Sequence, residues 1–336
     1  MRDATVIGMD ISKRNFELCE MDSRGKVLLR KRLYRSEVLV YFAQRSRSEV
    51  VMESCGGAHY WARELIKLGV EVKLIAPQFV KPFVRSNKSD AADAEAISEA
   101  GLRPQMRFVE VKTVAQQELQ HLHRIRERVI KAKVAASNEL RGMLLEYGVA
   151  IAQGKRALLL VPELVHRAPM SEFGKELVLE VWREVQLLEE RLASLDGRVR
   201  KLSSVHPVCR RLETIPGVGP IISTAVVAAM GDPTRFKNGR QFAASLGLVP
   251  KHSGTGGKLK ILGISKRGDG YLRKQLIHGA RSVLYVAAKK NDRLSRWATK
   301  LKISRGWNRA SVALANKNAR VIWALMRYEN DYCTTA

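Results

Sequence analysis

The sequence predicts a mixed α/β domain at the N-terminus, a middle region of long helices, and a mainly helical C-terminal region. Short apolar segments bounded by turn residues follow one another through the first region. Apolar residues at heptad spacing mark the middle, and helix-length apolar patterns separated by glycines mark the last part. We place the three regions at residues 1–105, 106–205 and 206–336.

The first region alternates between predicted strands and helices. The strands are expected at residues 4–10, 15–21, 26–33, 50–52 and 70–75, and the helices at 58–68 and 90–100. Ser89 precedes the second helix and can cap it. With a further helix before the fourth strand, the order is β-β-β-α-β-α-β-α. This is the order expected of a ribonuclease-H-like (RuvC-like) fold.

The middle region carries two stripes of apolar residues with heptad spacing, which is typical of coiled-coil helices. The stripes consist of Leu122, Ile125, Val129, Ala132 and Ala136, and of Val181, Val185, Leu188, Leu192, Leu195, Val199 and Leu202. Two such helices can pair within one chain or between two chains. The segment Gly148–Pro169 between them is expected to be a loop or an exposed insertion.

The C-terminal region contains four predicted helices, at 221–230, 240–246, 271–289 and 309–328. The stretch Gly247–Gly270 is rich in glycine and lysine, and we expect it to be too irregular for long elements.

Charge narrows the choice of partner. The chain has a net charge of +26, and residues 206–336 alone carry 24 basic and 6 acidic side chains. Such a surplus favours a polyanionic partner, because each phosphate contact releases condensed counterions. We find neither a signal peptide nor an apolar run near the roughly 20 residues that span a bilayer, so a membrane is not the expected partner. The four cysteines are scattered, which indicates a reducing, cytoplasmic compartment.

Four acidic residues are expected to meet at one edge of the first domain. Asp10 ends the first strand, Glu53 follows the fourth, and Asp90 and Asp93 share one face of a helix. In a ribonuclease-H-like sheet the ends of strands one and four are adjacent, and the last helix crosses nearby. Clustered carboxylates need cations between them, and oxygen ligands select Mg²⁺ (or Mn²⁺). Two such ions could clamp a phosphodiester.

A second candidate site lies in the basic C-terminal region. Residues 253–258 place Ser253 and Thr255 among glycines, next to Lys258. Glycine backbone amides can cradle a phosphate, and a serine there could attack phosphorus and hold a covalent DNA intermediate. The alternative is a loop that grips phosphate without covalent chemistry. The GxxxxGK[ST] pattern of a Walker loop is absent.

The segment Ile215–Gly219 joins two apolar helical segments and has the form of a helix-hairpin-helix. Its tight turn through Gly217 and Gly219 could aim backbone amides at a phosphate, or it could be a plain interhelical turn. The other residues expected to contact nucleic acid are Lys258, Lys266, Arg267 and Arg273.

Long motifs at both ends of the chain are similar to one known family. The N-terminal motifs are GMDISK (8–13), MESCGGAHYWARELIKLG (52–69), APQFVKPF (76–83) and KSDAADAEAI (88–97). The C-terminal motifs are TIPGVGPIISTAVVAAMGD (214–232), RFKNGRQFAASLGLVP (235–250), GGKLKILGISKRGDGYLRKQLIHGAR (256–281) and ANKNARVIWAL (315–325). In these the chain resembles the DEDD transposases of the insertion-sequence one-ten and eleven-eleven type, relatives of the pilin-gene invertases.

The resemblance implies roles for individual residues. The family's metal-site acids correspond to Asp10, Glu53, Asp90 and Asp93. Many members have Ser-Ser or Ser-Thr directly before Gly-Gly-Lys, and in this chain that place is Gly254-Thr255, with a serine one position earlier. The family's nucleophilic serine therefore corresponds to Ser253, with Thr255 as the alternative. The resemblance also implies a composite site formed between subunits of a homodimer, or a dimer of dimers. Double-stranded donor and target DNA would be the substrates, and a bridge RNA the guide.

Three other functions fit parts of the pattern. A ribonuclease-H-fold nuclease of the Holliday-junction type would use the acids and water without a serine. An architectural DNA-binding protein would use the helix-hairpin-helix and the coiled coil without chemistry. A sugar-kinase-like ATPase would need a glycine-rich phosphate turn after Asp10, which Ile11-Ser12-Lys13 does not provide.

Overall fold

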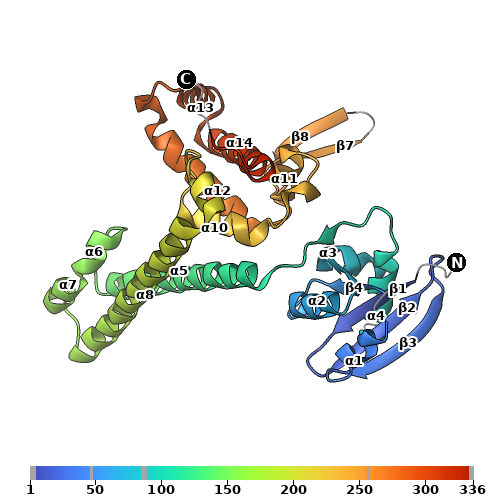
Figure 1. Ribbon diagram of the computed structural model, residues 1–336. Coiled ribbons are helices and arrows are strands. Elements are labelled where there is room, and N and C mark those ends of the chain that lie inside the picture. The colour runs from blue at the N-terminus through green and yellow to red at the C-terminus, as the bar shows by residue number, and fades with distance from the viewer. Residues whose placement is uncertain (1–4, 46–47, 85–88, 256–257, 333–336) are drawn as a thin grey trace. The chain divides into compact units, whose positions relative to one another are not determined.

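The computed structural model describes residues 5–45, 48–84, 89–255 and 258–332. The chain forms two compact units, residues 1–114 and 115–336 (Figure 1). The first unit is the predicted α/β domain. It reaches past the expected boundary at residue 105, because a short strand at residues 108–109 belongs to its sheet. The division into three regions stays a prediction.

The sheet of the first unit has the strand order β3-β2-β1-β4-β5-β6. Its strands are β1 (Val6–Ile11), β2 (Asn15–Met21), β3 (Val27–Tyr34), β4 (Glu49–Glu53), β5 (Glu71–Ile75) and β6 (Phe108–Val109). β4 pairs in parallel with both β1 and β5, and the remaining pairs are antiparallel. The predicted adjacency of the first and fourth strands is confirmed.

Helices cover both faces of this sheet. α1 (Val38–Ala43) and α2 (Ala58–Lys67) contribute Phe42, Trp61 and Leu65 to a core on one face. α4 (Asp90–Gly101) packs on the other face, where Ile97 joins Val51 and Ile75. α3 (Pro77–Val80) and a short 3-10 helix (Lys81–Phe83) lead toward α4.

Small residues let α4 lie directly on the sheet. A Cβ on Gly8 of β1 would come within 2.2 Å of Ser98 Oγ and 2.4 Å of the Ala94 carbonyl oxygen. The Gly8 amide instead donates to Ser98 Oγ at 2.8 Å, and that hydroxyl donates to the Cys19 carbonyl at 2.7 Å. One buried serine thus fixes the helix to β1 and β2.

The second unit contains the two long helices predicted for the middle of the chain, α5 (Val114–Glu146, beginning at the unit boundary) and α8 (Glu172–Val205). Ion pairs join Arg126 to Asp196 at 2.5 Å and Lys133 to Glu189 at 3.5 Å. Residue numbers rise along one helix as they fall along the other, so the helices are antiparallel and pair within one chain (Figure 1).

The segment expected to be a loop or insertion is instead largely helical. It forms α6 (Lys155–Leu159) and α7 (Val161–Arg167), and the side chains of Leu158, Val161 and Val165 pack into the core of the long helices. Each helix is too short for its apolar periodicity to stand out in the sequence.

The remaining helices form a separate core. They are α9 (Pro207–Glu213), α10 (Pro220–Ala229), α11 (Gly239–Ser245), α12 (Gly270–Val286), α13 (Arg293–Arg305) and α14 (Trp307–Tyr328), with short 3-10 turns at 233–235 and 287–289. Backbones meet where the α9–α10 turn crosses α12. A Cβ on Gly217 would lie 2.6 Å from the Gly279 carbonyl oxygen, and one on Gly279 would lie 2.0 Å from that of Gly217.

A buried histidine joins α5 to this core. His123 Nδ1 lies 2.9 Å from the Tyr271 hydroxyl of α12, and Nε2 lies 3.0 Å from Thr224 Oγ1 of α10. Burial lowers the pKa of His123 to about 4, so the ring is neutral at pH 7.

Where the structure describes the chain, it contains no helix with the length and hydropathy needed to cross a membrane.

Candidate functional site

The alternation of β1 and β4 places two acids on the face that α4 covers. Gly8 contacts α4, and Asp10 lies two residues further along β1, so both face the same side. Val51 likewise contacts Gly101 of α4, and Glu53 lies two residues further along β4. Since β1 and β4 are neighbouring parallel strands, both carboxylates lie at the same end of the sheet.

Asp90 and Asp93 lie in the first turn of α4, as the sequence predicts. The Ser89 hydroxyl caps the helix by accepting from the Ala92 amide at 3.2 Å. Asp90, Asp93 and Ile97 follow one another at helical spacing on a single face, and Ile97 is buried against the sheet. The packing that fixes Ser98 over β1 therefore also sets the position of both aspartates.

The three other acids act electrostatically on Asp10. The pKa of Asp10 is raised to about 6, first by burial and then by the negative charges of Asp93, Asp90 and Glu53. The pKa of Cys55 is also raised, by burial and by the charges of Glu53 and Asp10. The meeting of these four carboxylates at one metal site stays a prediction.

The cluster does not close into a ligand cage by itself. Within the described ranges, no three His, Cys, Asp or Glu side chains come close enough together to hold a metal ion. The donor chemistry nevertheless fits a hard divalent cation, since all four groups offer carboxylate oxygens and their charges repel one another at neutral pH. The side chains would have to rotate toward a shared ion.

Sequence reasoning missed an ion pair beside the cluster. Glu17 of β2 is the cross-strand partner of Asp10, and Arg32 of β3 is the partner of Glu17. The Arg32 guanidinium donates to the Glu17 carboxylate, and the Asp90 charge also acts on Arg32. Arg32 therefore lies within electrostatic range of one acid of the cluster. Only the strand register reveals it, because no local motif contains both residues.

The second candidate site lies on a β-hairpin, which corrects the prediction that Gly247–Gly270 has no long elements. β7 (Pro250–Thr255) pairs antiparallel with β8 (Lys258–Ile264). Ser253 is therefore a strand residue rather than part of a turn. It is exposed, and its cross-strand partner is Lys260, so both side chains project from one face of the hairpin. Lys258 is exposed at the start of β8.

Backbone packing holds the base of this hairpin in place. A Cβ on Gly268 would lie 1.8 Å from the Ser245 carbonyl oxygen, and one on Gly247 would lie 2.3 Å from that of Arg267. Arg273 of α12 donates to the carbonyls of Leu246, at 2.9 Å, and Arg267, at 3.1 Å. Arg273 thus has a structural role, and its contact with nucleic acid stays a prediction. Lys266, with a positive φ of 55°, and Arg267 are exposed.

The predicted helix-hairpin-helix turn does join two helices, α9 and α10. Gly217 has a φ of +83° and contacts α12, while the Pro216 carbonyl accepts from Asn318 at 2.9 Å. The turn is therefore fixed from inside the unit, and phosphate binding by Gly217 and Gly219 stays a prediction.

Comparison with known proteins matches transposase families to both the N-terminal and the C-terminal part of the chain. Residues 209–295 match the family described as Transposase IS116/IS110/IS902 family, and residues 7–149 match a second transposase family, the DEDD transposases of IS110 type. The transposase for insertion sequence element IS1111A of Coxiella burnetii is 41% identical in an alignment that covers 99% of this chain and 92% of that protein. The chain belongs to the IS110 family of transposases.

Two further relatives show the same coverage. A Pseudomonas aeruginosa protein named "Probable family 20 transposase" is 47% identical, over 97% of this chain and 98% of its own length. The transposase for insertion sequence element IS1328 of Yersinia enterocolitica is 36% identical over 97% of both chains. The match extends through both units, so membership applies to the whole chain.

Membership in the IS110 family decides between the general functions considered from the sequence. The chain is an insertion-sequence transposase, an enzyme that cuts and rejoins DNA. The chain is therefore neither an architectural DNA-binding protein nor a Holliday-junction type nuclease.

Proposed function

We propose that this transposase cuts and rejoins DNA through two sets of groups. The acids Asp10, Glu53, Asp90 and Asp93 would hold Mg²⁺ or Mn²⁺, and Ser253 would be the nucleophile. A bound divalent ion would stabilise charge on the oxygens of the reacting phosphodiester. The observation that carries the metal assignment is the placement of Asp10 and Glu53 at the same end of neighbouring parallel strands, on the face that α4 covers with Asp90 and Asp93 in its first turn. The raised pKa of Asp10, caused by burial and by its three acidic neighbours, supports it.

The proposed step is a transesterification. The Ser253 oxygen forms a bond to phosphorus, one P–O ester bond of the DNA breaks, and the serine proton leaves to solvent or a base. The departing oxygen takes up a proton and becomes a free hydroxyl. The phosphoserine conserves the ester, so a second DNA hydroxyl can reverse the step without ATP.

The position of Ser253 supports this role. Ser253 is exposed on a strand, and the side chain of its cross-strand partner Lys260 projects from the same face, with the two Cβ atoms about 5 Å apart. A cation there favours binding of a phosphate and helps to balance the charge that develops on its oxygens. Thr255 is the alternative nucleophile, two residues further along the same strand.

The partners follow from the same proposal. Donor and target DNA would be double-stranded, and a structured guide RNA would select their sequences by pairing with both. A homodimer or dimer of dimers would bring two copies of each set of groups together. A cytoplasmic location at the nucleoid is part of this proposal.

The covalent intermediate gives the direct test. The protein and its co-purifying nucleic acid are incubated with labelled DNA spanning an end of the insertion sequence, with Mg²⁺ or with a chelator, and analysed by denaturing electrophoresis. We expect an adduct only with Mg²⁺, and peptide mapping should place it on Ser253. Ser253→Ala should bind DNA and form no adduct, and Ser304→Ala, at an exposed serine of α13, should behave like the parent.

Two outcomes change the proposal. An adduct mapped to Thr255 would move the nucleophile by two residues and keep the mechanism. Full recombination by a Ser253→Ala, Thr255→Ala double variant would rule out covalent catalysis from this hairpin.

A further inference from the structure

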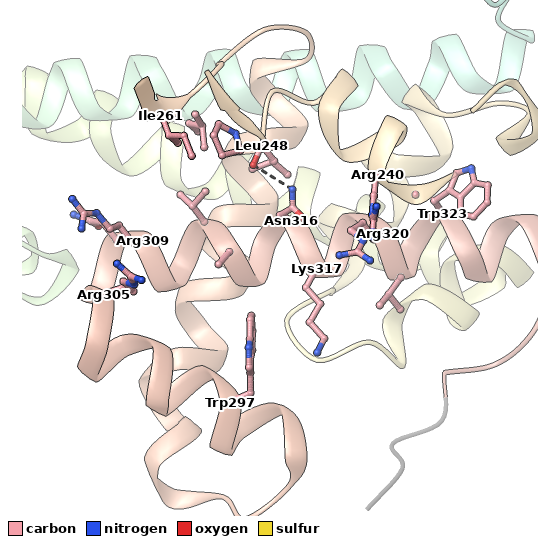
Figure 2. A pocket seen from close by; sticks show the side chains of 18 of the residues that line it. Arg240, Leu248, Ile261, Trp297, Arg305, Arg309, Asn316, Lys317, Arg320 and Trp323 are labelled. Atoms are coloured by element: carbon pink, nitrogen blue, oxygen red, sulfur yellow. Dashed lines mark hydrogen bonds between the residues drawn. The ribbon is translucent and has the colours of Figure 1, made fainter. Parts of the chain in front are cut away.

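A large groove runs along one face of α14 in the second unit (Figure 2). Its volume of about 1560 Å³ exceeds the roughly 300–1,000 Å³ of small-molecule pockets. Its walls come from the start of α11, from strand β8, and from Trp297 and Arg305 on α13. The groove is therefore open to a polymer rather than shaped around a single small ligand.

The side chains of α14 form a continuous stripe along the groove floor. Lining residues recur every turn from Asn308 to Ala324, a length of about 24 Å at 1.5 Å per residue. One strand of nucleic acid advances about 3.4 Å per stacked nucleotide and more when extended, so several nucleotides fit along this stripe.

All charged side chains that line the groove are basic. Its lining includes five cationic side chains and no acidic one, namely Arg240, Arg305, Arg309, Lys317 and Arg320. Over the ranges that the structure describes, none of these five lies within 4.0 Å of a carboxylate. Because no carboxylate neutralises them at close range, their positive charge favours binding of a phosphate backbone in the groove.

One aromatic side chain is open to a ligand in this groove. Trp297 is 36% exposed, and the Lys317 ammonium lies 4.8 Å from its ring centroid. The other lining tryptophan, Trp323, is only 8% exposed, and its indole N–H donates to the Pro233 carbonyl at 2.9 Å. Trp297 is thus the more exposed ring; the Lys317 ammonium covers one of its faces, so a base would stack on the other (Figure 2).

This combination selects unpaired nucleotides. A base inside a duplex is already stacked and paired, so its face cannot reach a ring in a groove wall, whereas an unpaired base can stack there while basic side chains follow its backbone. DNA is the polymer on which an IS110 transposase acts, and only an unpaired stretch of it could place the face of a base in this groove.

The groove also adjoins the hairpin that carries Ser253. Ile261 and Leu262 of β8 line it and are 68% and 48% exposed, and the cross-strand partner of Ile261 is His252. We propose that this groove binds a stretch of single-stranded DNA, with one base stacked on Trp297, next to the β7–β8 hairpin. The proposal rests on the DNA-cutting activity of the family and not on the identity of the nucleophile.

Equilibrium binding tests the groove without requiring catalysis. The full chain is titrated against fluorescently labelled oligonucleotides of one mixed sequence, as single-stranded DNA, as single-stranded RNA and as duplex DNA. Trp297→Ala should weaken binding of single-stranded DNA about five- to hundredfold and change duplex binding less than twofold. Trp297→Phe should keep most of the affinity, because it retains a ring.

A charge variant tests the backbone contacts separately. Arg309→Ala should reduce the slope of log affinity against log salt for single-stranded DNA by about 0.7, the value for one phosphate contact. Lys290→Ala, at an exposed lysine that does not line the groove, is the matched control and should leave the slope unchanged.

A third measurement does not depend on a variant folding correctly. Photocrosslinking of the parent chain to single-stranded DNA with 5-bromouracil should label the peptide that contains Trp297. The proposal would be overturned if Trp297→Ala lost equal affinity for single-stranded and duplex DNA, or if crosslinks formed only outside the groove. Tighter, Trp297-dependent binding of RNA would overturn DNA as the occupant. Loss of covalent adduct formation alone would affect only the proposed function.

Discussion

Gly8 of β1 lies directly beneath Ser98 of α4, with the Gly8 amide donating to Ser98 Oγ at 2.8 Å. The same helix carries Asp90 and Asp93 in its first turn, before this contact. The contact therefore sets how the acidic end of α4 lies over Asp10. It links the packing of the first unit to the geometry of its candidate metal site.

Gly8→Ala should disturb both the packing of α4 on the sheet and the geometry of the candidate metal site. The added Cβ would meet Ser98 Oγ at 2.2 Å, so α4 must shift, and overpacking of this kind costs about 1–3 kcal/mol. Hydrogen exchange of β1 and α4 amides measures this loss within the first unit. Gly56→Ala is the control, since nothing lies within 4 Å of a Cβ there. Unchanged protection in Gly8→Ala would show that the contact is not tight.

Asp10→Asn and Asp93→Asn should each reduce strand cleavage about a hundredfold or more, because a neutral amide is a much weaker ligand for a divalent cation and leaves its charge less balanced. DNA binding, measured by anisotropy, should stay within twofold. Glu99→Gln, which removes only an exposed ion pair with Arg103 on the same helix, should cleave normally. Full recombination by both aspartate variants with Mg²⁺ would refute the assignment.

The Asp10→Asn variant should also remain folded. The pKa of Asp10 is raised to about 6, so the folded state disfavours the charged form of this side chain. Above pH 6 the folded chain should therefore be at least as stable with an uncharged amide at this position as with the carboxylate. Urea unfolding at pH 7 should give a stability at least equal to that of the parent, so loss of cleavage can be separated from loss of structure.

His123 predicts a pH dependence of stability in the second unit. Its pKa is lowered from 6.5 to about 4, so the unfolded chain takes up a proton at a higher pH than the folded chain does. Stability should be full above pH 6.5 and fall as the pH drops toward 4, by at most about 3 kcal/mol. His123→Gln should remove this decline, measured by urea unfolding at several pH values. His121→Gln, at an exposed histidine two residues earlier on α5, should retain it.

The apolar stripe on α8 packs mainly within the chain, so a variant that tests dimerisation has to be placed outside this stripe. Leu195 is only 6% exposed, whereas Leu187 is 65% exposed. Leu195→Ala should cost about 2–5 kcal/mol of stability, and Leu187→Ala should stay within about 0.5 kcal/mol. Sedimentation of Leu187→Glu then reports on self-association without damaging the core. An equal loss of stability in both leucine variants would contradict the observed packing.

The predictions from sequence succeeded where burial leaves a signal in the residue types. Residues 6–9 form a short buried run that leads to Asp10, so the strand and the acid near its end are both visible in the sequence. The start of α4 is visible from its capping residue Ser89, and α12 is visible from its apolar positions.

The β7–β8 hairpin was missed because the described side chains of its first strand from Lys251 to Gly254 are all exposed, which leaves no alternation to detect. α13 is polar around much of its surface and escaped for a related reason. The Glu17–Arg32 pair could not be found because it depends on the register of three strands.

The contact between Gly217 and Gly279 has an evolutionary consequence. Each glycine occupies the space that a Cβ on the other would need, and neither can become smaller to accommodate its partner. A side chain gained at one position therefore has no compensating change at the other. In a library that randomises both codons and selects for active transposase, survivors should keep glycine at both positions, and double substitutions should be no more frequent than single ones.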